Sequence, residues 1–315
     1  MVTGETVLVS RAALHFWEEP CISGTKGSGT VFFCGCSLHC IYCQNREISN
    51  GQGGKALTVD ELAQVFLKLQ AQGAHNINLV TPTHYVLQIR EALIRAKEMG
   101  LKIPVVYNGS GYEKPESLKL LEGLVDIWLT DFKYMDKELA RELSHAEDYP
   151  ERAREALAEM VRQCPETVFG KAPAAREAET GNAETVGKEV TAEAGKEAAE
   201  AAASEAADTE ETDTGLMERG VIVRHLLLPG HVKNAKNVVR YVHETYGDQV
   251  YLSLMNQYTP MGHFEKYPYL NRKVTKREYD RLIDFTLSLG VTKAFIQEGD
   301  TQEASFIPPF DLTGL

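Results

Sequence analysis

The sequence predicts an α/β fold, an open partial (β/α) barrel of about six βα units that carries a disordered acidic insertion. Short β-branched or aromatic runs alternate with amphipathic stretches, which is typical of a parallel sheet with helical crossovers. The seven expected strands are Thr30–Cys34, Ile77–Thr81, Pro104–Tyr107, Ile127–Thr130, Val221–Leu228, Val250–Leu254 and Ala294–Gln297. Seven strands are too few for a closed eight-stranded barrel, so we expect about six βα units and an edge strand.

The expected insertion is residues 165–218, which have the composition of a chain that forms no core. This segment holds 14 acidic and 4 basic residues, 14 alanines and one aromatic residue, Phe169. Such a composition buries too little apolar area to offset the entropy lost on ordering. We interpret it as a solvated low-complexity tract, with a partner-binding helix as the alternative. Residues 1–164 and 219–315 would then form the barrel domain.

Capping signals mark the expected helices. Thr58-Val-Asp-Glu61 and Thr275-Lys-Arg-Glu278 both have the capping-box pattern that opens a helix. Gly73 and Gly290 follow the corresponding amphipathic stretches, where glycine commonly ends a helix. Pro115 stands where a first-turn proline is tolerated.

Charge and hydropathy limit the classes of function. The formal net charge of −12 argues against binding to nucleic acid or to an anionic membrane surface. No apolar run reaches the length of a membrane-spanning helix. Residues 1–20 lack the basic and apolar regions of a secretory signal. We therefore expect a cytoplasmic protein. We also expect a monomer.

Polar and thiol groups follow most of the expected strands. In parallel barrels the chemistry lies at the C-terminal ends of the strands, so segments that follow different strands meet at one face. These segments are Cys36–Cys43, Thr81–His84, Asn108–Tyr112, Asp131–Lys133, Pro229–His231 and Asn256–Pro260. Their convergence predicts a functional site at that face.

Three of the six cysteines form a C-x3-C-x2-C motif, Cys36, Cys40 and Cys43. Soft thiolates select iron–sulfur clusters or zinc. Structural zinc usually has four ligands with paired spacings, and no second C-x2-C pair is present. Three thiolates suit a [4Fe–4S] cluster with one iron left open. Cys34 is interpreted as a buried strand residue rather than a fourth ligand.

The motif, with an aromatic residue before its last cysteine, resembles the radical S-adenosylmethionine (SAM) signature. The longer string Gly29–Ser49 is similar to radical SAM proteins related to the pyruvate formate-lyase activating enzyme, an activase of glycyl-radical enzymes. Arg224–Gly230 and Ser253–Pro260 also resemble that group. The resemblance covers roughly residues 5–164 and 219–300.

The resemblance implies an enzyme with two cofactors, a [4Fe–4S] cluster and SAM. Cys36, Cys40 and Cys43 would hold three irons, and SAM would chelate the fourth. One electron, from a donor such as a flavodoxin or a ferredoxin, would cleave SAM to methionine and a 5′-deoxyadenosyl radical that abstracts a hydrogen atom. A protein substrate of the glycyl-radical type is one expectation, and no catalytic side chain is assigned.

The resemblance also implies a set of SAM-binding residues. Tyr42 matches an aromatic residue beside the adenine, Asp131 and Lys133 match a D-x-K pair near the SAM carboxylate, and Arg224 matches a strand-five arginine. Activases carry Gly-Gly-Glu after the second strand, whereas this chain has Thr81-Pro-Thr-His84. The predicted cofactor-binding residues are Tyr42, Thr81, Thr83, His84, Asn108, Ser110, Asp131, Lys133 and Arg224. His84 could equally be a hydrogen-bonded core histidine.

Two other readings of the same residues stay open. The first is a radical SAM enzyme that modifies a small molecule. The second is an iron–sulfur electron carrier or redox sensor, which needs no SAM site and should not cleave SAM.

Overall fold

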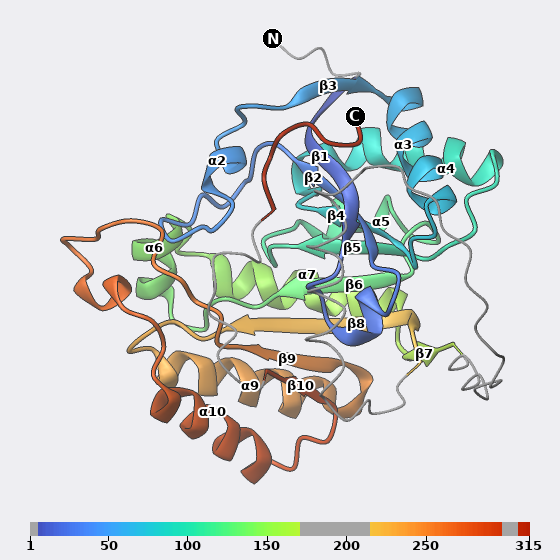
Figure 1. Cartoon of the computed structure of the whole chain (residues 1–315). Coiled ribbons are helices and arrows are strands. Elements are labelled where there is room, and N and C mark those ends of the chain that lie inside the picture. The colour runs from blue at the N-terminus through green and yellow to red at the C-terminus, as the bar shows by residue number, and fades with distance from the viewer. Residues whose placement is uncertain (1–5, 171–214, 298–307) are drawn as a thin grey trace, which may run out of the picture.

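A computed structural model describes residues 6–170, 215–297 and 308–315. The strands form one sheet, and the helices lie outside it (Figure 1). The strands are β1 (Thr6–His15), β2 (Ser28–Phe33), β3 (Lys55–Thr58), β4 (Ile77–Val80), β5 (Val105–Gly109), β6 (Ile127–Asp131), β7 (Val168–Phe169), β8 (Met217–Leu226), β9 (Tyr251–Met255) and β10 (Ala294–Ile296). The α-helices are α1 (Pro20–Ser23), α2 (Arg46–Ser49), α3 (Val59–Ala71), α4 (Val86–Glu98), α5 (Pro115–Lys119), α6 (Lys137–Ser144), α7 (Tyr149–Gln163), α9 (Val232–Tyr246) and α10 (Lys276–Ser288). Short 3-10 turns cover Thr83–Tyr85, Gly247–Gln249 and Pro268–Asn271.

The sheet order is β10-β9-β8-β6-β5-β4-β2-β1-β3, with β7 paired to β8. The seven strands from β2 to β10 on this path run parallel to their neighbours, in chain order. Among the described strands β10 and β3 are the two ends of the sheet, so the barrel is open. The predicted fold class and all seven predicted strands are confirmed.

Two strands beyond the predicted seven extend the sheet past β2. β1 pairs antiparallel with β2, and β3 pairs antiparallel with β1. β3 was missed because its four residues alternate too briefly to show a period, and three of them are exposed. β1 was not predicted because its polar residues, such as Arg11, interrupt the apolar pattern.

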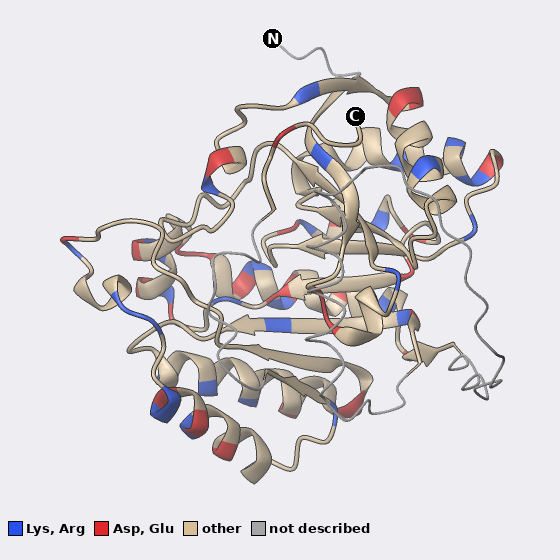
Figure 2. Cartoon of the chain, in the orientation of Figure 1, with Lys and Arg blue, Asp and Glu red and all other residues tan. Residues whose placement is uncertain are grey.

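Burial explains why the parallel strands were readable from the sequence. Every residue of β2, β4 and β5 is buried, as expected when both faces of a parallel strand are covered. Charged residues lie mainly on the outer helices and loops, and few fall on the strands (Figure 2). No helix in the described ranges is long and apolar enough to cross a bilayer.

The capping predictions are confirmed. The Thr58 and Thr275 side chains accept hydrogen bonds from the backbone N–H groups of Glu61 and Glu278, and each glutamate side chain accepts one in return. Pro115 occupies the first turn of α5. The two capping boxes fix where α3 and α10 begin.

The edges of residues 165–218 are described, whereas residues 171–214 lie outside the described residues. β7 pairs antiparallel with the first part of β8, and the Gly170 N–H donates to the Leu216 carbonyl oxygen at 2.8 Å. β8 therefore begins at Met217, within the range expected for the insertion. The two described ends of the segment lie side by side.

Candidate functional site

A cavity of about 1040 Å³ lies at the C-terminal ends of the parallel strands. Its lining includes the three motif cysteines and seven of the nine predicted cofactor-binding residues. These seven are Tyr42, Thr81, Asn108, Ser110, Asp131, Lys133 and Arg224. Residues separated by almost the whole chain thus share one cavity, because parallel strands end at the same face.

The three thiols approach the cavity on the loop that follows β2. Cys36, Cys40 and Cys43 are each partly exposed and line the cavity, whereas Cys34 is buried against Phe32 and outside the lining. Each motif sulfur has a hydrogen-bond donor. The Leu38 N–H lies 3.5 Å from Cys36 Sγ, the Ser144 hydroxyl lies 3.0 Å from Cys40 Sγ, and a backbone N–H at Asn45 serves Cys43.

Three thiols on one loop are soft donors of the kind that iron–sulfur clusters take. In the described parts of the chain no three His, Cys, Asp or Glu side chains converge on one metal position. A cubane binds its three thiolates at three different irons, so the sulfurs surround a volume rather than a point. Burial raises the pKa of Cys43 to about 11 and also raises the pKa of Cys40. Ligation would therefore displace thiol protons at neutral pH.

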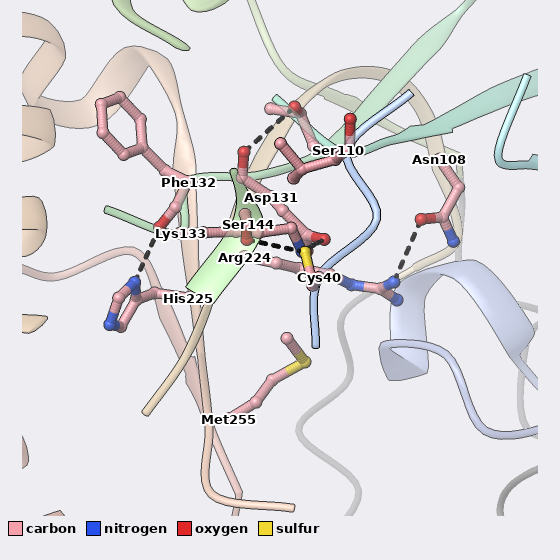
Figure 3. A network of polar contacts seen from close by, with 12 residues as sticks. Cys40, Asn108, Ser110, Asp131, Phe132, Lys133, Ser144, Arg224, His225 and Met255 are labelled. Atoms are coloured by element: carbon pink, nitrogen blue, oxygen red, sulfur yellow. Dashed lines mark hydrogen bonds and ion pairs between the residues drawn. The ribbon is translucent and has the colours of Figure 1, made fainter. Parts of the chain in front are cut away.

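Asp131 and Lys133 form an ion pair at the end of β6 (Figure 3). Burial lowers the pKa of Lys133, but the charge and hydrogen bond of Asp131 together with the nearby Cys40 and Tyr149 outweigh burial and hold that pKa well above its usual range. Lys133 is therefore a fixed positive charge on the cavity wall. The Lys133 N–H donates to the Tyr149 hydroxyl at 2.9 Å, and that hydroxyl donates to the Ser110 carbonyl oxygen at 2.8 Å, which ties β6 to the end of β5.

Arg224 on β8 is held by two carboxylates that follow β1. Its Nε lies 2.8 Å from Glu19 Oε1 and its Nη2 lies 2.6 Å from Glu19 Oε2, and it also pairs with Glu18. Burial raises the pKa of Glu19, but the charge and hydrogen bonds of Arg224 outweigh it, so the pKa is lowered overall. The Arg224 guanidinium is thus already paired with carboxylates of the protein.

Asn108 and Ser110, at the end of β5, have different neighbours. Asn108 Oδ1 lies 3.5 Å from Arg224 Nη1 (Figure 3). Its amide nitrogen lies 3.4 Å from Glu18 Oε1. The N–H of Ser110 donates to Glu113 Oε1 at 3.0 Å. Asn108 therefore extends the Arg224 network, whereas Ser110 is linked to a buried carboxyl group.

Thr81 lines the cavity, whereas Thr83 and His84 lie outside its lining. The Thr83 hydroxyl donates to Glu113 Oε1 at 2.8 Å, and His84 Nε2 lies 2.8 Å from the Cys34 carbonyl oxygen. The chain turns away from the cavity here because residues 83–85 form a 3-10 turn. Both side chains are engaged by the protein itself.

Tyr42 is 6% exposed and lines the cavity. Its hydroxyl lies 2.7 Å from that of Tyr134, and its ring meets Tyr258 edge-on. The Tyr134 hydroxyl is in turn 2.6 Å from Ser144 Oγ. A row of hydroxyls thus connects the cysteine loop with the end of α6.

Sequence reasoning missed four polar residues of this site, Glu18, Glu19, Tyr134 and Ser144. None belongs to a recognisable motif, and Ser144 reads as an ordinary residue of an amphipathic helix. The only sequence signal was the adjacent acidic pair at 18–19, just before Pro20. Their roles follow from contacts across 92 to 206 positions of the chain.

Part of this chain matches a known family. Residues 30–170 match the family model described as the radical SAM superfamily. That family uses a [4Fe–4S] cluster and SAM. The match spans the cysteine loop and the Asp131–Lys133 pair.

Two curated relatives cover the chain to different extents. An uncharacterized protein of Methanocaldococcus jannaschii is 24% identical over 280 residues, which are 86% of this chain and 64% of the relative. The pyruvate formate-lyase-activating enzyme of Clostridium pasteurianum is 33% identical over 113 residues, 34% of this chain and 46% of that enzyme. The chain thus spans less than two thirds of each relative's length.

Solved structures show weak overall likeness. SuiB of Streptococcus suis bound to S-adenosylmethionine is similar over 84% of this chain and 48% of its own, with TM-score 0.47 and 12% identity. Methylornithine synthase (PylB) is similar over 84% of this chain and 69% of its own, with TM-score 0.42 and 14% identity.

Proposed function

We propose, from the radical SAM domain that this chain carries, that the protein is an enzyme that reductively cleaves SAM and uses the resulting radical to abstract a hydrogen atom. The observation that carries the proposal is the cavity whose lining includes both the three motif thiols and the Asp131–Lys133 pair. Cys36, Cys40 and Cys43 would hold a [4Fe–4S] cluster, which would supply the one electron that cleaves SAM to methionine and a 5′-deoxyadenosyl radical.

Lys133 is the residue that we assign to the carboxylate of SAM. Its ammonium group is charged and partly buried, with 19% of its side chain exposed, so a carboxylate in the cavity would gain a charge-assisted hydrogen bond. Asp131 holds that ammonium group in place. Arg224 is less suited to this task because Glu18 and Glu19 already pair with it.

Thr81 is the side chain that we assign to the amino group of SAM. It lines the cavity, and a hydroxyl can accept a hydrogen bond from an ammonium group. Thr83 and His84 are not needed for this contact, since their polar atoms bond to Glu113 and Cys34. Tyr42, which is buried beside the cysteine loop, would pack against the adenine.

For the substrate, we propose a glycyl-radical-type protein partner, supported by the 33% identity to a pyruvate formate-lyase-activating enzyme over 113 residues. The alternative is a small molecule, which would share the cavity with the cluster and SAM. Deuterium transfer from each candidate into 5′-deoxyadenosine distinguishes the two.

The first experiment measures the cluster and SAM cleavage together. Anaerobically reconstituted protein should bind about four irons and four sulfides, and with a reductant it should convert SAM to methionine and 5′-deoxyadenosine. Cys40→Ala should lose both properties. Cys164→Ala is the matched control, since this cysteine is buried and outside the cavity. Tight zinc without sulfide, or a cluster without SAM cleavage, would contradict the proposal.

A further inference from the structure

The hydroxyl of Ser144 contacts the sulfur of Cys40 from a separate element of the fold (Figure 3). The distance from Ser144 Oγ to Cys40 Sγ is 3.0 Å, and Ser144 is 1% exposed. The other two motif sulfurs take backbone donors from their own loop, at Leu38 and Asn45. Cys40 alone among the three has a side-chain donor in these contacts, and a substitution can remove it.

Backbone contacts hold this donor in place. The Ile41 N–H donates to the carbonyl oxygen of Leu143 at 2.9 Å, so the cysteine loop is fastened to the last turn of α6. The chain reaches α6 directly from the end of β6, where Lys133 and Tyr134 lie. The position of Ser144 is therefore set by the same strand end that carries the Asp131–Lys133 pair.

The hydroxyl contact continues through two tyrosines. Ser144 Oγ lies 2.6 Å from the Tyr134 hydroxyl, which lies 2.7 Å from the Tyr42 hydroxyl. Both distances are normal for O–H···O hydrogen bonds. All three residues are buried, so water does not compete for these donors.

Ligation of Cys40 fixes which group donates in each hydrogen bond of this row of hydroxyls. A thiolate has no proton and can only accept, so Ser144 must donate its single hydroxyl proton to Sγ. Tyr134 must then donate to Ser144, and Tyr42 must donate to Tyr134. Hydrogen bonds aligned in this way polarise one another, which strengthens the contact with the sulfur.

We propose that Tyr42, Tyr134 and Ser144 form a directed hydrogen-bond chain that raises the reduction potential of the cluster through the sulfur of Cys40. The proposal rests on the proposed function, in which Cys40 is a cluster ligand. One-electron reduction adds negative charge that spreads onto the thiolates, and a donor at sulfur stabilises this reduced state more than the oxidised state. Ser144 and Tyr134 are thus positioning residues that act through Cys40.

The test is the midpoint potential of the reconstituted cluster, followed by electron paramagnetic resonance during a redox titration. Ser144→Ala should lower the equilibrium constant for reduction about tenfold, which is about 59 mV for one electron. Ser144→Thr keeps the hydroxyl and should stay near the parent. Ser288→Ala is the control, because Ser288 also ends a helix, α10, but bonds only to the carbonyl oxygen of Phe285 among the described contacts.

A second variant covers the case in which Ser144→Ala holds no cluster. Tyr134→Phe removes the donor to Ser144 and should shift the potential in the same direction by a smaller amount. A parent-like potential in a fully loaded Ser144→Ala, or in Tyr134→Phe when the alanine variant is empty, overturns the inference and leaves the proposed function standing. A parent protein that binds no cluster overturns both.

Discussion

Arg224→Met tests whether the buried Arg224–Glu18–Glu19 group is held together by charge. The side chains of Arg224, Glu18 and Glu19 are 12%, 8% and 5% exposed, so methionine would replace the stem and leave two buried carboxylates without their cation. Removing one partner of a buried ion pair costs about 3–5 kcal/mol. Glu18 keeps a donor in Asn78 at 2.8 Å, whereas Glu19 loses its guanidinium bonds, so we expect a loss of about 4 kcal/mol in the free energy of unfolding at pH 7.5.

The pH dependence of this loss has a definite sign. In the parent, Arg224 holds the folded-state pKa of Glu19 below its ordinary value of 4.5. Glu19 therefore contributes stability above pH 4.5, and this stability is lost as the pH falls through the folded pKa. In Arg224→Met, burial is opposed only by the smaller effects of the Ser253 and backbone hydrogen bonds, so the pKa of Glu19 rises. The carboxylate then destabilises the fold at neutral pH, and this cost shrinks as it takes up a proton.

The assay is urea unfolding of the apoprotein at pH 7.5 and pH 5.0, followed by circular dichroism. The difference between parent and variant should be smaller at the lower pH. Adding Glu19→Gln to Arg224→Met should recover part of the loss, since the substitution removes the unpaired charge. An equal loss at both pH values, with no recovery in the double variant, would show that the contribution of Arg224 is packing rather than charge.

Three further predictions concern the SAM site, one buried histidine and the segment that interrupts the fold. Lys133→Ala should weaken SAM binding about 10- to 150-fold with the cluster retained, because a charge-assisted hydrogen bond is lost; the exposed Lys137→Ala is the control in equilibrium dialysis. Burial lowers the pKa of His225 from 6.5 to about 4, so the parent should lose stability as the pH falls from about 6.5 toward 4. His225→Asn should lose less over that range in urea titrations, whereas the exposed His263→Asn should follow the parent. Replacing residues 171–214 by a short Gly/Ser loop should leave cluster loading and the thermal midpoint nearly unchanged, because the paired strands β7 and β8 hold the two ends together; a large fall in the yield of folded protein would contradict this.

Local patterns in the sequence were enough to predict the fold class and to single out the cysteine loop. Short β-branched or aromatic runs marked the seven parallel strands, and in β2, β4 and β5 every residue is buried. The capping boxes at Thr58 and Thr275 depend only on residues three apart, so they too were readable. The spacing of Cys36, Cys40 and Cys43 carried its own chemistry, because three thiolates on one short loop suit few ligands other than a cluster.

Contacts between residues far apart in the sequence decided which polar side chains line the cavity and which of them pair with one another. Thr81 and Thr83 look equivalent in the sequence, yet the 3-10 turn directs Thr83 to Glu113 and leaves Thr81 on the cavity wall. Nothing local indicates that the acidic residues at 18–19 would pair with Arg224, since the partners are brought together only when β1 and β8 join the same sheet.

Ser144 shows most clearly what could not be predicted from the sequence. By sequence it is a serine at the end of an amphipathic helix, and propensity assigns it no role. Its hydroxyl meets Cys40 because β6 and α6 return the chain to the loop after β2, 104 positions away. The ligand loop is determined by the sequence itself, because coordination chemistry depends on the spacing of neighbouring residues, whereas the groups that position and tune those ligands come from remote segments and exist as a set only in the folded chain.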